Sequence, residues 1–167
     1  MIKINGTLLT VITVMFLGIN ANSYNLYFGN LHAHTSYSDG IGTPEEAFKL
    51  MRESKAGDFG AITDHSKQLM DNLSNWEKTK KLADKYTDES FVTIAGCEVL
   101  LGYETGEMCT FGIENITHKK DAPDFYDWLV ENENSISQFN HPKAYPNQFY
   151  NFVGRTNARN KHIKLIE

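Results

Sequence analysis

This chain has few cysteines and no apolar run long enough to cross a bilayer. The only two cysteines are Cys97 and Cys109. They exclude a multi-disulfide scaffold, although one bridge stays open for an exported chain. We expect both to be small buried hydrophobes rather than metal ligands. Cys97 adjoins Glu98 on an expected strand, so it should point away from whatever Glu98 binds.

Positive charge is also in deficit, with 16 Lys and Arg against 21 Asp and Glu and a net charge of −5. This balance argues against a nucleic-acid partner. It still leaves Arg52, Lys67, Lys143 and Arg155 for local contacts with a small phosphorylated substrate. The sequence has neither a Gly-rich phosphate loop nor a Gly-x-Ser-x-Gly elbow, which excludes two common catalytic designs.

The first 23 residues are typical of a secretory signal. They combine Lys3, a weakly polar to apolar run at 7–19, and the small-x-small end Ala21-Asn22-Ser23. The run is shorter than the ~20 apolar residues of a membrane span, and no membrane span is expected, although retention as an uncleaved anchor stays open. We therefore predict a secreted or periplasmic protein whose residues 24–167 form one domain, with a net charge near −6 once Lys3 is removed.

The most informative motif is Leu31-His32-Ala33-His34-Thr35, followed by Asp39-Gly40. Residues two apart on a strand point to the same face, so the rings of His32 and His34 converge on one point. Imidazole and carboxylate together suit borderline divalent metals such as zinc, manganese or iron. The motif therefore predicts a metal chelate.

Further candidate ligands follow other strand-like runs, in Thr63-Asp64-His65, Gly96-Cys97-Glu98 and Phe139-Asn140-His141-Pro142. An isolated histidine is more often a hydrogen-bonded core or loop residue than a ligand. Four histidines at strand ends make that interpretation much weaker.

Strands and helices are expected to alternate along the chain. Thr43-Pro44-Glu45-Glu46 is a capping box that opens a helix to about Ala56, and Asp121 caps a helix to about Val130. A third helix is expected at 74–86, and strands are expected at 24–32, 59–63, 91–95, 108–113, 135–139 and 163–166. Repeated strand and helix units indicate parallel pairing, with ligands at the carboxyl ends of the strands.

These motifs resemble the polymerase and histidinol phosphatase (PHP) superfamily, most closely its secreted metallohydrolases. The resemblance begins near Tyr24 and extends to the last residue. The motifs that carry it are, in chain order, residues 29–40, 43–46, 61–66, 96–98 and 139–142.

The resemblance implies a distorted TIM-like (β/α)₇ barrel with two or three divalent metals, Zn, Mn or Fe. It assigns His32 and His34 to one metal together with Glu98, which bridges to a second metal bound by His141. Asp39 and His65 would hold a third. Asp64 is expected to orient a ligand or loop rather than bind metal.

Two departures from the family pattern matter. Where the family has a histidine about ten residues beyond the bridging glutamate, this chain has Glu107, a tentative ligand. The late Asp-x-His of the family is absent after His141. The chain thus resembles the first two-thirds or so of a barrel, which either belongs to a longer protein or closes its open edge as a homo-oligomer.

The expected activity is metal-dependent hydrolysis of phosphoesters by a metal-bound hydroxide, with no side-chain nucleophile. Lys67, Lys143 and Arg155 are the expected substrate contacts. Two alternatives stay open, a non-catalytic metal-binding remnant and a hydrolase of esters or carbamates on the same site. The missing segment leads us to expect weak or absent phosphoesterase activity from residues 24–167 alone.

Overall fold

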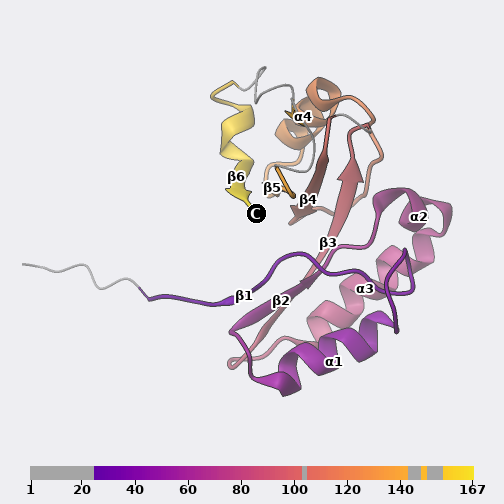
Figure 1. The fold of residues 1–167 in the computed structure, drawn as a ribbon, viewed down its shortest axis with the longest axis vertical. Helices are drawn as coiled ribbons and strands as arrows, with labels where there is room; N and C mark the ends of the chain where they lie inside the picture. The colour runs from indigo at the N-terminus through magenta and orange to yellow at the C-terminus, as the bar shows by residue number, and fades with distance from the viewer. Residues whose placement is uncertain (1–24, 103–104, 143–147, 150–155) are drawn as a thin grey trace, which may run out of the picture.

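A computed structural model of the chain describes residues 25–102, 105–142, 148–149 and 156–167. Its six-stranded sheet has the order β1-β2-β3-β4-β5-β6 and curls into part of a barrel (Figure 1). The expected α/β architecture and the partial barrel are therefore confirmed. The expected signal segment, residues 1–23, lies outside the described residues.

The strands are short except for the third. They are β1 Gly29–Asn30, β2 Phe59–Ile62, β3 Val92–Leu100, β4 Glu107–Phe111, β5 Ile136–Phe139 and β6 Ile163–Ile166. The helices are α1 Pro44–Ser54, α2 Ser66–Asp71, α3 Leu73–Tyr86, α4 Ala122–Glu131 and the short 3₁₀ helix η2 Arg159–Lys161. Helices α1, α2 and α3 lie along one side of β1–β3, and α4 lies beside β4 and β5 (Figure 1).

Helix α1 begins at the expected capping box. The Thr43 side chain accepts a hydrogen bond from the Glu46 backbone N–H, and the Glu46 carboxylate accepts one from the Thr43 N–H at 2.7 Å. The helix ends at Ser54, where Lys55 adopts a left-handed conformation with φ 52°. Phe48 is fully buried and packs with Ile62 of β2 and neighbours on α3, which fixes the helix against the sheet.

The main core lies between α4 and the second half of the sheet. Phe125 and Leu129 of α4 are fully buried against Val99 of β3 and Met108 of β4. Burial of each such side chain contributes about 1.5–3 kcal/mol. This apolar layer supports the strands from behind, so their opposite face is free to hold polar groups.

Strand β3 is shared between two kinds of pairing. Residues 92–95 pair in parallel with β2, and residues 96–100 pair with β4 in antiparallel fashion. At the change-over stands Gly96, where a Cβ atom would lie 2.6 Å from Phe111 Cδ1 and 2.8 Å from Thr110 O. The close approach of β4 therefore requires glycine at this position.

Two expectations about elements are wrong. Strand β4 is antiparallel to both neighbours, and its connection to β3 at 101–106 is too short for the crossover that a parallel partner needs. The strand expected at 24–32 is reduced to β1, since only Gly29 and Asn30 pair with β2. The sequence reading also missed α2, which directly follows His65.

Replacing Thr43 with alanine removes one half of the capping box while leaving the helix body unchanged. We expect Thr43→Ala to lower the free energy of unfolding by about 1 kcal/mol, measured by urea denaturation. Lys49→Ala, on the exposed side of the same helix, serves as the control and should change stability little. An unchanged midpoint for Thr43→Ala would contradict a stabilising cap.

Candidate metal centre

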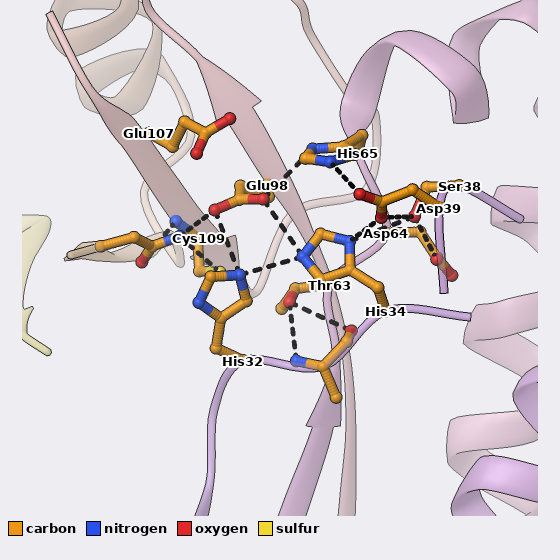
Figure 2. Close-up of polar contacts among 12 residues, drawn as sticks. His32, His34, Ser38, Asp39, Thr63, Asp64, His65, Glu98, Glu107 and Cys109 are labelled. Carbon is orange, nitrogen blue, oxygen red and sulfur yellow. Dashed lines mark hydrogen bonds and ion pairs between the residues drawn. The ribbon is translucent and has the colours of Figure 1, made fainter. Parts of the chain in front are cut away.

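One end of the curled sheet gathers most of the ligands expected from the sequence. His32 and His34 follow β1, His65 follows β2 and His141 follows β5. Glu98 lies within β3 and pairs with His65 through an isolated bridge. Because β4 runs the opposite way, its first residue, Glu107, reaches this same end (Figure 2).

Glu98 is the centre of this group and is only 2% exposed. Its Oε1 lies 3.1 Å from His32 Nε2, and its Oε2 lies 3.2 Å from His34 Nε2 and 3.1 Å from His65 Nδ1. The two Nε2 atoms of His32 and His34 are 3.0 Å apart. Nitrogen and oxygen ligand atoms that converge at these distances fit a divalent transition metal.

The electrostatics of the metal-free site follow from these contacts. Burial by itself raises the pKa of Glu98, but hydrogen bonds from His32, His34 and His65 outweigh it and hold the pKa well below its usual range. The hydrogen bond to Glu98 raises the pKa of His65 to about 9 and also raises that of His32. Protons on the rings therefore balance the buried carboxylate when no cation does.

A second ligand group adjoins the first. His141 Nε2 lies 3.6 Å from Glu98 Oε1 and 3.6 Å from Glu107 Oε2. Burial raises the pKa of Glu107, and the nearby charge of Glu98 raises it further. The three side chains have ligand atoms within 4.8 Å of one another, so Glu98 is placed to serve both groups.

Asp39 contacts the histidines from the outer side. Its oxygens lie 3.2 Å from His34 Nδ1 and 3.5 Å from His65 Nε2, and its side chain is 67% exposed. Desolvation by itself raises the pKa of Asp39, but the charges of His65 and His34 together outweigh it and the pKa is lowered. Asp39 is thus near the rings but outside the groups of converging ligand atoms found in the described residues.

Asp64 holds the loop that carries His34. Its Oδ1 accepts hydrogen bonds from Thr35 N at 2.7 Å and Ser38 Oγ at 2.6 Å, and its Oδ2 accepts one from Thr35 Oγ1 at 2.6 Å. Asp64 is 1% exposed. These contacts orient the loop, and Ser38 Oγ in turn lies 3.1 Å from His34 Nδ1.

Three residues at the site were missed by sequence reasoning, namely Cys109, Asn140 and Glu167. Glu167 Oε1 lies 3.4 Å from His32 Nδ1, and its Oε2 accepts a hydrogen bond from the His141 backbone N–H at 2.7 Å. Asn140 donates to Glu98 Oε1. No local sequence signal placed Cys109 here, because only its pairing with Glu98 in the antiparallel β3–β4 ladder brings it to the site.

A pocket of about 520 Å³ opens beside the ligands, lined by His65, Glu98 and Glu107 on one side and by Lys67, His118 and Lys120 among others. Lys67 lies on the wall of this pocket, and its contact with a substrate stays a prediction. Arg52 instead pairs with Asp88. Lys143 and Arg155 lie outside the described residues.

The chain was compared with models of protein families and with curated proteins. No protein-family model matches the chain, and a search of curated proteins finds no significant match. Within the described residues, none of the helices has the length and apolar character of a membrane span.

The raised pKa of His65 makes the stability of the metal-free protein depend on pH. Protonated His65 is favoured in the folded state, so its contribution is complete below an unfolded pKa of about 6.5 and is lost as pH rises through about 9. We expect the unfolding free energy of chelator-treated protein to fall across this window. His65→Asn should flatten the fall, whereas His118→Asn, whose ring nitrogen contacts Met70 Sδ, should keep it. A slope equal in wild type and His65→Asn would contradict the proposed ion pair.

Proposed function

We propose that this protein is a metal-dependent hydrolase of phosphoesters, of the PHP type that its sequence motifs resemble. The observation that carries the proposal is the convergence of three imidazoles on the buried carboxylate of Glu98. A second group, Glu98, Glu107 and His141, lies within the same few ångströms. Two adjacent divalent ions sharing one carboxylate form the usual centre for displacement at phosphorus.

The candidate ligands would form two metal positions, one on each side of Glu98. His32, His34 and His65 would hold ions on one side of Glu98, and Glu107 and His141 on the other. Divalent ions at these positions would supply Lewis acidity, lowering the pKa of a bound water toward ~7 and stabilising negative charge on a phosphoryl group. The role of Glu98 is to keep both positions at a fixed separation.

The pocket beside Glu98 and Glu107 gives a substrate access to both positions. Lys67 and Lys120 on its wall would attract an anionic substrate to a chain that is otherwise acidic. Asp64 would keep His34 in position through the loop it holds. We further propose, from the sequence of residues 1–23, that the protein is exported.

Replacing both His32 and His34 with alanine should remove most of the bound metal, since the pair supplies two of the converging nitrogens. The measurement is elemental analysis of purified protein after dialysis against a divalent-metal buffer. His118→Ala together with His162→Ala is the control, because neither ring contacts Glu98 in the described structure. Equal metal content in the two double variants would rule out the site.

Glu98→Gln tests the function itself, because the amide keeps the shape of the side chain but removes its charge. We expect metal affinity to fall at both positions and hydrolysis of p-nitrophenyl phosphate to fall by at least about 100-fold. Glu114→Gln, an exposed glutamate on another loop, should retain both properties.

Two outcomes for the wild-type protein and one for the Glu98→Gln variant have separate meanings. Metal binding without hydrolysis of any phosphoester or carboxyl ester would favour a metal-binding protein without turnover. Glu107, where the family has an imidazole, gives that alternative its basis. Hydrolysis of carboxyl esters alone would move the activity to acyl carbon. Unchanged metal content and unchanged activity in Glu98→Gln would overturn the proposal.

A further inference from the structure

Cys109 lies on the same face of the sheet as Glu98. The two residues are direct partners in the antiparallel β3–β4 ladder, and direct partners across such a ladder project to one side. Cys97, one residue before Glu98, projects to the other side and packs in the apolar core with Val99. The two cysteines therefore lie on opposite faces of the sheet, and both are fully buried.

Cys109 packs with Ala61 and Phe111 in a small buried cluster, but its sulfur also lies beside two other candidate ligand atoms. Its Sγ, a ring nitrogen of His32 and a carboxylate oxygen of Glu98 all lie within 4.8 Å of one another. Three separate segments supply these atoms, the loop after β1, strand β3 and strand β4. A metal ion bound between them would receive one nitrogen, one oxygen and one sulfur ligand.

A buried amide is directed at the sulfur. Asn140 Nδ2 donates a hydrogen bond to Cys109 Sγ at 3.1 Å, and Asn140 Oδ1 accepts one from the Cys109 backbone N–H at 3.3 Å. Asn140 is fully buried, so its N–H groups cannot donate to solvent instead. An N–H group that points at sulfur stabilises negative charge there, as it does around metal-bound thiolates.

We propose that Cys109 is a thiolate ligand that joins His32 and Glu98 in holding one metal ion. This inference rests on the proposed metal centre but not on the proposed hydrolysis. When the metal binds, the S–H bond breaks, the proton passes to water and the sulfur lone pair forms the bond to the metal. Asn140 is then a positioning residue that orients both the sulfur and Glu98.

The sulfur ligand has a consequence for the choice of metal. Thiolate is a soft ligand that selects zinc, cobalt or ferrous iron, whereas manganese and magnesium prefer oxygen. Of the three metals that the sequence leaves open, zinc and iron fit this position and manganese does not. The position with Cys109 would therefore discriminate between metals that Glu107 and His141 alone would accept.

Cobalt(II) is the probe that separates this proposal from a site built only of nitrogen and oxygen. A Co(II)–thiolate bond gives a charge-transfer band in the near ultraviolet, and Co(II) bound by histidine and carboxylate gives visible bands without it. The full chain is titrated with Co(II) under anaerobic conditions. We expect the near-ultraviolet band in the wild-type protein and in Cys97→Ala, and its loss in Cys109→Ala.

Competition with a zinc chelator gives the second measurement. Cys109→Ala should bind zinc at least about 10-fold more weakly, with a smaller change for manganese. Cys97→Ala is the matched control, since it also removes one cysteine sulfur, but from the opposite face of the neighbouring strand. Cys109→Ser and the thermal unfolding of metal-free protein guard against a loss caused by misfolding.

The possible outcomes are distinct. Visible Co(II) bands without a charge-transfer band in the wild-type protein would overturn the role of Cys109 and leave the metal centre standing. Persistence of the band in Cys109→Ala would overturn it as well. A wild-type protein that takes up no Co(II) would overturn the metal centre and this inference together, whatever the result of the hydrolysis assays.

Discussion

The ionised carboxylate of Glu98, enclosed at one end of the sheet, sets the conditions that the surrounding structure has to meet. Removing such a charge from water costs several kcal/mol unless partners compensate for it. Rings from the loops after β1 and β2 meet this need, and so does the amide of Asn140 after β5. Each of these segments must therefore reach the same point, which ties the local folding of four strands to one side chain.

Protons and metal ions compete for the same place in this arrangement. The metal-free protein balances Glu98 by raising the pKa values of His32 and His65, so that the rings carry charge. A divalent ion at the proposed site would need those rings neutral and would replace their protons. The contacts that stabilise the metal-free protein at neutral pH would thus reduce its apparent metal affinity, and this reduction would diminish as pH rises.

Local sequence signals predicted well the parts that local interactions determine. The capping box at Thr43 and the cap at Asp121 predicted two helix starts, and the spacing of His32 and His34 predicted that their rings converge. The direction of β4 was not predicted, because it depends on the length of a turn and on which strand it meets rather than on its own residues. Cys109 was assigned to the core for that reason, since only the register of β4 against β3 brings it to Glu98.

The antiparallel strand β4 places several candidate ligands of the site on a single hairpin. Glu98, Glu107 and Cys109 all belong to one β3–β4 hairpin, and the ladder between residues 96–100 and 107–111 fixes their spacing independently of the other strands. The turn at 101–106 contributes Gly102 to the pocket wall, whereas the three ligand candidates belong to the paired strands. Insertions or deletions in this turn can consequently change the shape of the pocket entrance without changing the register of the β3–β4 ladder. Substrate specificity and the proposed metal binding can therefore evolve separately within one hairpin.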